Sequence, residues 1–299
     1  MIKKTVAFTN PVYLSLKDKQ LVINIPEDSK ISKTIPIEDI GVVVLEHKQI
    51  TITHALISAL VENNCALITC GDNMMPTGLT MPLEMNTIQS ERFVCQLEAS
   101  LPLKKQLWQQ TIQAKIRNQA GALRYLHNIQ ARNMLEWAND VRSGDADNKE
   151  ARAAAYYWKN MFPQISFFTR DPEGFAPNNL LNYGYAILRA IVARALVSSG
   201  LLPTLGIHHH NRYNAYCLAD DIMEPYRPYV DVLVADIIER YTDYEKLTTE
   251  IKRELLQIPT IDVTINENRS PLMIAVSITT ASLAKCFSGE LRRISYPEL

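Results

Sequence analysis

The sequence predicts an α+β protein, in which a small N-terminal β-rich domain with one helix precedes a larger, mostly α-helical domain. Up to about residue 84, short runs of β-branched and aromatic residues alternate with turn residues. Beyond that point, apolar residues recur at helical spacing over long stretches. The segment Met81-Pro82-Leu83 between the two patterns is typical of a linker. We therefore place the domains at residues 1–84 and 85–299.

In the first domain, the runs of β-forming residues are short and are separated by turn residues. The expected strands are residues 5–9, 12–16, 20–25, 40–45 and 65–69. The turn Lys17-Asp18-Lys19 predicts a hairpin between the second and third of these strands. Thr53 can cap a short helix that runs through Val61. A small β-rich domain with one helix follows from this pattern.

In the second domain, apolar residues spaced three or four apart predict a succession of helices. These are expected over residues 87–99, 103–135, 147–161, 180–199, 230–241, 244–256 and 271–287. Gly121 is a candidate break inside the second of them. A loop rich in Pro, Gly and Phe is expected over residues 163–177. A larger, mostly α-helical domain follows from this pattern.

Composition indicates a cytoplasmic globular protein. Hydrophobic residues make up 47% of the 299 residues and charged residues 21%, the net charge is −1, and the five cysteines lack metal-site spacing. We expect no membrane span and no signal peptide, since residues 1–6 lead straight into a strand-like pattern. Basic residues outnumber acids between Asn86 and Arg170. That basic middle suits a phosphate backbone, although on charge alone a solvated helical surface is the favoured explanation.

The richest group of metal-ligand side chains lies between Gly206 and Pro228. Three consecutive histidines, His208 to His210, are followed by Asp220, Asp221 and Glu224. In a helix, Asp221 and Glu224 lie on one face and could share an ion. The alternative is that the aspartates cap a helix and the histidines form a solvated turn.

A distant glutamate is a candidate third member. Asp147 to Glu150 fits a capping box, with Asp147 as the N-cap and Glu150 at N3. The alanines that follow leave space above Glu150, while Arg152 and Tyr157 offer phosphate or stacking partners. Such an open glutamate suits a bulky anionic substrate.

Five motifs in this order resemble one family. They are N-x-E-x-x-A-A from Asn148, L-N-Y-G-Y from Leu181, S-G at Ser199, L-G-x-x-H ending at His209, and D-I-M-E-P-Y-R-P from Asp221 to Pro228. The chain resembles the CRISPR-associated integrase that carries out spacer acquisition, the first of the adaptation proteins. The last motif is closest to the branch found beside single-protein RNA-guided effectors. The resemblance covers the whole chain.

The resemblance implies a catalytic metal site formed by Glu150, His209 and Glu224, with Asp221 as a supporting acid. His209 is assigned by spacing, because it stands three residues after Gly206 and twelve before Asp221, with a histidine on either side. The implied ion is Mg²⁺ or Mn²⁺. The implied reaction is attack of a DNA 3′-hydroxyl on a phosphodiester, which inserts short foreign DNA into a CRISPR array.

The resemblance also implies partners. These are double-stranded DNA (the incoming segment and the CRISPR repeat), a second copy bound through the β-rich domain, and a small ferredoxin-like second adaptation protein in a heterohexamer-type complex. The need for other effector proteins is left open. Arg152, Arg227 and Tyr157 are the expected DNA contacts. Two alternatives remain, a metal-dependent nuclease that hydrolyses branched DNA and a non-catalytic scaffold for DNA ends.

Overall fold

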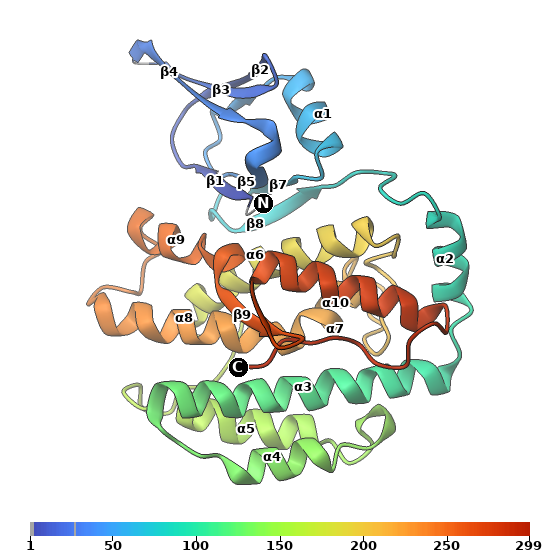
Figure 1. The fold of residues 1–299 in the computed structure, drawn as a ribbon. Helices are drawn as coiled ribbons and strands as arrows, with labels where there is room; N and C mark the ends of the chain where they lie inside the picture. Colours follow the sequence, from blue (N-terminus) through green and yellow to red (C-terminus); the bar gives the residue numbers. More distant parts are fainter. Residues whose placement is uncertain (1–2, 27) are drawn as a thin grey trace. The chain divides into compact units, whose positions relative to one another are not determined.

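The computed structural model describes residues 3–26 and 28–299, and it forms two compact units (Figure 1). The first unit ends at Thr87 and the second runs from Ile88 to Leu299. The prediction that the N-terminus is not a signal peptide rests on residues 1–6. The first two of these, Met1 and Ile2, lie outside the described residues. Strands dominate the first unit and helices the second, so the predicted α+β class is confirmed.

The first unit contains two four-stranded sheets and one helix, α1 (His54–Glu62). One sheet has the order β1 (Lys4–Phe8), β5 (Ile40–Leu45), β7 (Ala66–Cys70) and β8 (Pro76–Thr80). The other has the order β4 (Asp28–Pro36), β3 (Gln20–Ile25), β2 (Tyr13–Lys17) and β6 (Thr51–Ile52). The predicted β2–β3 hairpin is confirmed, and Asp18 and Lys19 in its turn both have positive φ, as the tightest hairpin turns require. Strands β4, β6 and β8 were not predicted.

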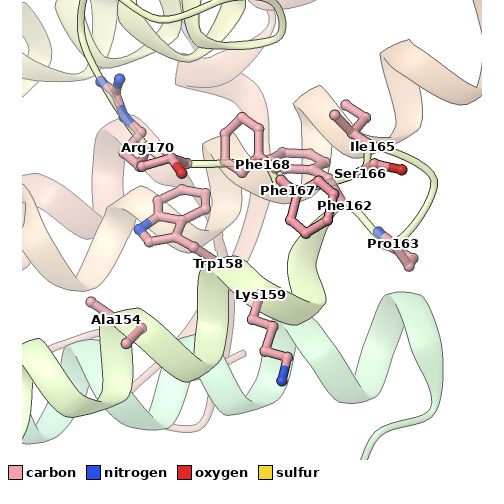
Figure 2. Close-up of a pocket in the computed structure, with 12 residues that line it drawn as sticks. Ala154, Trp158, Lys159, Phe162, Pro163, Ile165, Ser166, Phe167, Phe168 and Arg170 are labelled. Carbon is pink, nitrogen blue, oxygen red and sulfur yellow. The ribbon is translucent and has the colours of Figure 1, made fainter.

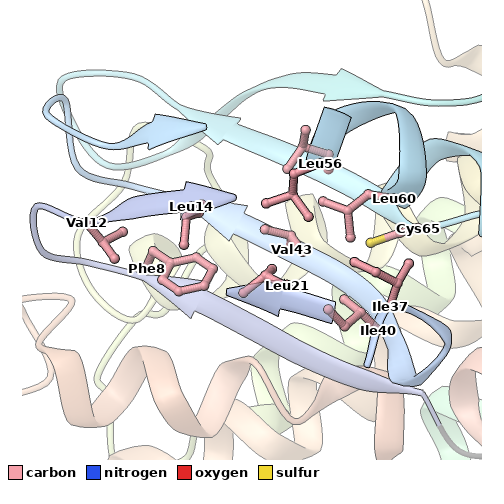
Figure 3. Packing of buried hydrophobic residues seen from close by; sticks show 11 residues of the cluster. Phe8, Val12, Leu14, Leu21, Ile37, Ile40, Val43, Leu56, Leu60 and Cys65 are labelled. Carbon is pink, nitrogen blue, oxygen red and sulfur yellow. The ribbon is translucent and has the colours of Figure 1, made fainter. Parts of the chain in front are cut away.

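The core of this unit is aliphatic. Figure 3 shows Leu14 of β2, Leu21 of β3 and Val43 of β5 together with Leu56 and Leu60 of α1, all with no exposed surface. Burying one such side chain contributes roughly 1.5–3 kcal/mol. Strand β5 is buried almost throughout, which accounts for the continuous β-branched run that predicted it, whereas β2 and β3 each bury one leucine fully, Leu14 and Leu21.

The second unit is built of helices joined by short 3₁₀ turns and one hairpin. Its α-helices are α2 (Gln89–Leu97), α3 (Leu101–His127), α4 (Arg132–Asn139), α5 (Lys149–Met161), α6 (Asn178–Ser198), α7 (Cys217–Met223), α8 (Arg227–Arg240), α9 (Thr249–Leu255) and α10 (Leu272–Phe287). The 3₁₀ turns are η2 (Ser143–Asp145), η3 (Glu224–Tyr226) and η4 (Ile258–Thr260), and the hairpin pairs β9 (Asp262–Ile265) with β10 (Asn268–Pro271). A short η1 (Ile37–Asp39) belongs to the first unit. The hairpin was not predicted.

Helix α3 is the longest element and packs against α4, α5, α8 and η3 (Figure 1). The expected break at Gly121 is wrong, because α3 continues to His127 and ends where Asn128 adopts a left-handed conformation. Gly121 serves another purpose. A Cβ there would lie 2.2 Å from the carbonyl oxygen of Leu299, so the missing side chain lets the C-terminal residue pack on the helix.

Helix α6 is long and apolar enough to cross a membrane by length and composition alone. Its most apolar 18-residue window has a mean hydropathy of 1.4, but 78% of that window is buried inside the unit. Leu181, Ile187 and Leu188 have no exposed surface at all. This burial identifies α6 as the central helix of the core.

Candidate active site

Glu150 stands in the first turn of α5 but does not cap it. The cap comes from Asp145, whose two carboxylate oxygens accept hydrogen bonds from the backbone N–H groups of Lys149 (2.9 Å) and Glu150 (3.0 Å). The predicted capping box of Asp147 and Glu150 is therefore wrong, and Asp147 pairs with Arg142 instead (3.0 Å). Freed from the backbone, the half-buried Glu150 side chain is available for chemistry.

Glu150 and Glu224 meet at one cation, Lys115. The Lys115 ammonium lies 2.6 Å from Oε1 of Glu150 and 2.6 Å from Oε2 of Glu224. Burial by itself would raise the pKa of Glu224, but the charges of Arg227 and Lys115 outweigh it and hold that pKa below its usual value. Two carboxylates from α5 and η3 are thus close enough to share one positive charge.

Helix α3 organises this meeting point. Trp108, Lys115 and Asn118 lie on one of its faces, spaced by seven and three residues. Trp108 stacks on the imidazole of His208, with ring centroids 4.2 Å apart. Asn118 donates a hydrogen bond to the carbonyl oxygen of Pro225 (2.8 Å) and so fixes the turn that carries Glu224. One helix therefore positions both halves of the site.

Asp221 fixes the histidine loop. Its fully buried carboxylate accepts backbone hydrogen bonds from Ile207 (2.7 Å), His208 (3.0 Å) and His209 (3.3 Å). Such a ring of successive N–H groups is an anion-binding concavity. Gly206 makes the close approach possible, because a Cβ there would lie 2.8 Å from Oδ2 of Asp221. Asp221 therefore holds the backbone of the histidine loop in place.

The three histidines occupy different environments. Nδ1 of His209 lies 2.5 Å from Oδ1 of Asp221, and this hydrogen bond is the main reason why the pKa of His209 is raised. The charges of Glu224 and Glu150 raise it further, so His209 lies within electrostatic reach of both carboxylates. Burial against Trp108 lowers the pKa of His208. His210 lines a hollow beside the loop. Only His209 has its ring held by an acid.

Asp220 does not cap a helix. The expectation that it caps a helix is wrong, since α7 begins at Cys217 and Asp220 lies within it. Its carboxylate lies 2.6 Å from Nε of Arg189 and 2.6 Å from Nδ2 of Asn214. It ties the histidine loop to α6.

The three expected DNA contacts differ in their placement. Arg152 is exposed on α5, with its guanidinium 4.4 Å from the centre of the Trp137 ring. Arg227 is partly buried and lies 3.0 Å from Oε1 of Glu224. Tyr157 is fully buried, and its hydroxyl donates a hydrogen bond to Asp231 (2.8 Å). Tyr157 was therefore wrongly predicted as a DNA contact, because it lies on the core face of α5.

Asp231 is a buried carboxyl behind the site. It accepts hydrogen bonds from Tyr157 and Tyr185, and the Tyr185 ring carries the Arg227 guanidinium on its face (4.8 Å). Burial raises the pKa of Asp231 to about 7, even though both hydroxyls favour the charged form. Tyr185 thus links the two groups, because its hydroxyl binds Asp231 and its ring contacts Arg227.

The donor set fits a hard divalent ion. Within the part of the chain that the structure describes, no three histidine, cysteine or carboxylate side chains form a ready-made metal cluster, and the Lys115 ammonium contacts both glutamates. Oε2 of Glu224 is buried, and the Lys115 ammonium lies 2.6 Å from it. Two carboxylates that already share a cation, with an imidazole nearby, are suitable ligands for Mg²⁺ or Mn²⁺.

A large aromatic pocket opens further along α5. It has a volume of about 800 Å³ and is shown in Figure 2. Trp158, Phe162 and Phe168 line it, and the Phe167 side chain is 100% exposed at its edge. Lys159 and Arg170 add positive charge. The sequence showed the phenylalanine-rich loop but gave no sign that it would form a pocket with α5.

Sequence reasoning missed Lys115 and Asp145. Lys115 is one of many basic residues in the middle of the chain, and its partners come from elements 35 residues or more away. Asp145 lies two residues before the aspartate that matched the capping box, and the left-handed Asn148 moves the helix start past Asp147. Neither feature has a local sequence signal.

Comparison with known proteins gives consistent results. A family model described as "CRISPR associated protein Cas1" matches residues 6–256. The chain is 36% identical over 301 residues to the CRISPR-associated endonuclease Cas1 of Neisseria meningitidis serogroup C, covering 100% of this chain and 97% of the relative. A casposase bound to integration product shares the fold with a TM-score of 0.78 at 20% identity, covering 98% of this chain and 92% of that one. A chain of a Cas6-RT-Cas1–Cas2 complex gives a TM-score of 0.73 at 18% identity, covering 97% of this chain and 35% of that one.

Proposed function

We propose, from the premise that this chain belongs to the Cas1 family of CRISPR-associated proteins, that it is a metal-dependent DNA integrase and endonuclease. The observation that carries the proposal is the meeting of Glu150 and Glu224 at a single cation, with the Asp221-bound His209 in electrostatic reach. These are the residues that the family motifs single out as metal ligands. The names of the relatives, an endonuclease and a casposase bound to integration product, support the same class of reaction.

The proposed reaction is a transesterification. The 3′-hydroxyl of a short DNA attacks a phosphodiester at the edge of a CRISPR repeat, one phosphorus–oxygen bond forms, and another breaks. The displaced strand leaves with its own 3′-hydroxyl, which takes the proton that the attacking hydroxyl loses. One phosphodiester replaces another, so the step needs no outside energy source and no covalent enzyme intermediate.

Each site residue has a separate task in this scheme. An ion held by Glu150, Glu224 and His209 would polarise the phosphate and stabilise the developing charge. Asp221 accepts from Nδ1 of His209, which leaves Nε2 as the nitrogen that can bind an ion. Arg227 holds Glu224 by its Oε1 and keeps the carboxylate charged. The oxygen-rich set favours Mg²⁺ or Mn²⁺.

The DNA would lie along α5. Arg152 and Lys159 offer phosphate contacts on this helix, and such contacts position a duplex without reading its sequence. Ala154 and Trp158 follow Glu150 by one and two helical turns, roughly 6 and 12 Å along the axis. They line the aromatic pocket of Figure 2. We propose that this pocket stacks an unpaired base of a DNA end that reaches Glu150.

The assembly is also part of the proposal. A chain of similar fold is part of a complex whose name includes Cas2. We propose that this chain likewise binds a small second adaptation protein, and that its β-rich unit pairs with a second copy. Association with the single-effector branch rests on the D-I-M-E-P-Y-R-P motif and stays a prediction, as does a cytoplasmic location.

A product assay tests the proposal. The purified protein, its small partner, a short duplex with 3′-hydroxyl ends and a repeat-bearing plasmid are incubated with Mg²⁺ or Mn²⁺. Covalently joined strands support integration. The second candidate is hydrolysis of branched DNA, which the name of the endonuclease relative favours, and it predicts free ends only. A non-catalytic scaffold would give neither product and would bind no divalent ion at Glu150.

A further inference from the structure

Lys115 is a largely buried cation that contacts both glutamates of the site. Its side chain is 12% exposed, and its ammonium touches Glu150 and Glu224 at 2.6 Å each. Glu224 also contacts Arg227, so two positive charges already balance these two carboxylates. The charges of these four side chains therefore cancel before any divalent ion arrives.

A neutral site of this kind attracts a dication weakly. An ion that binds both carboxylates must come within a few ångströms of the ammonium, where like charges repel strongly in a buried setting. A lysine can resolve the conflict because its charge sits at the end of a flexible four-carbon chain, unlike the planar guanidinium of Arg227. Arg227 is further held on the Tyr185 ring, 4.8 Å from its centre. Of the two cations, Lys115 is the one that can leave.

We propose that Lys115 is a built-in counter-ion that holds Glu150 and Glu224 together in the metal-free protein and competes with the divalent ion for them. This rests on the proposed function only in that the two glutamates are taken as metal ligands. Without Lys115, two carboxylates would face each other across the site with Arg227 alone to balance them. With Lys115, the site stays folded until an ion displaces the ammonium.

The proposal explains two observations together. The glutamates lie close enough to share a charge, yet within the described residues they form no ready-made metal cluster with His209. In addition, Oε2 of Glu224 is buried and lies 2.6 Å from the ammonium of Lys115. A carboxylate oxygen has two acceptor lone pairs, so this oxygen can bind an ion once the ammonium leaves.

The test compares Lys115→Met with Lys105→Met, an exposed lysine of the same helix. Mn²⁺ binding is measured by calorimetry on protein stripped with a chelator, and thermal unfolding is followed with and without Mn²⁺. We expect Lys115→Met to bind Mn²⁺ at least about tenfold more tightly than the wild type, since a competing charge is gone. We also expect metal-free Lys115→Met to unfold at a lower temperature than the metal-free wild type. Mn²⁺ should raise the unfolding temperature of Lys115→Met more than it raises that of the wild type. Lys105→Met should match the wild type.

Two further variants make the result decisive. Lys115→Arg keeps the charge, and we expect it to bind Mn²⁺ no more tightly than the wild type, which tests the proposal even if Lys115→Met does not fold. Unchanged or weaker Mn²⁺ binding by Lys115→Met, or tighter binding by Lys115→Arg, would overturn the proposal. Glu150→Gln should abolish Mn²⁺ binding. If binding survives in that variant, the metal site of the proposed function fails, which is a different result from a failure of the Lys115 proposal.

Discussion

Replacing Asp221 by Asn tests how the histidine loop is held. The fully buried carboxylate accepts four hydrogen bonds, two at Oδ2 from Ile207 and His208 and two at Oδ1 from the backbone and ring of His209. An asparagine keeps one acceptor oxygen and turns an NH₂ group toward two donors. Two hydrogen bonds to a charged group are lost, so we expect Asp221→Asn to lower the free energy of unfolding by about 3 kcal/mol or more.

The loss should also depend on pH. Because the pKa of His209 is raised in the folded protein, chiefly by its hydrogen bond to Asp221, its protonation stabilises the fold. That stability is full below the pKa of an unfolded histidine, about 6.5, and is lost as the pH rises through the folded value. The destabilisation caused by Asp221→Asn should therefore be larger at about pH 5.5 than at about pH 8.5.

The assay is urea unfolding at both pH values, with an NMR titration of His209. Asp220→Asn is the matched control, because its buried carboxylate accepts two hydrogen bonds, from Arg189 and Asn214, of which an asparagine oxygen keeps one, so the expected loss is smaller, about 1.5 kcal/mol. The reasoning is refuted if Asp221→Asn is no more destabilising than Asp220→Asn. It is equally refuted if the pKa of His209 stays raised in the Asp221→Asn variant.

Three other predictions concern the core and the pocket. Asp231 has its pKa raised to about 7 by burial, so the stability it confers when protonated falls as the pH rises from about 4 to about 7. Between about pH 5 and 8 the wild type should lose up to about 3 kcal/mol that Asp231→Asn does not lose, and equal slopes in urea unfolding would contradict this. Gly121→Ala should cost about 1–3 kcal/mol, because its Cβ would meet the carbonyl oxygen of Leu299, and an unchanged thermal midpoint would show that the C-terminus does not pack there. Phe167→Ala should weaken binding of DNA with an unpaired 3′ end by about 1–3 kcal/mol and spare blunt duplex, as measured by fluorescence anisotropy. Phe175→Ala, equally exposed but outside the pocket, is its control, and an equal loss in both variants would refute a specific stacking role.

Local sequence patterns predicted the strands and helices that are apolar and buried over most of their length, such as β5 and α6. They did not predict β8, whose Pro76 and Gly78 are poor strand formers and which is held by its pairing with β7. Nor did they predict the uninterrupted path of α3 through Gly121, which depends on the distant Leu299. Tertiary contacts decide these cases.

The candidate site was likewise predicted only in part from the sequence. The family motifs placed Glu150 and Glu224, and spacing chose His209 among three histidines, the one that the structure ties to Asp221. The role of Lys115 could not be predicted, because it depends on α3, α5 and η3 meeting at one point. The burial of Tyr157 was missed as well, since the side of α5 that faces the core is set by its packing.

The most direct test of the central claim is strand joining by Glu150→Gln and Glu224→Gln. Wild-type protein with its small partner, a short 3′-hydroxyl duplex and a repeat-bearing plasmid should give covalent joins in Mn²⁺ or Mg²⁺. Both variants should lose joining by about a hundredfold or more, yet bind the duplex as the wild type does in an anisotropy control. Undiminished joining by both variants would contradict the assignment of the two glutamates as the catalytic pair.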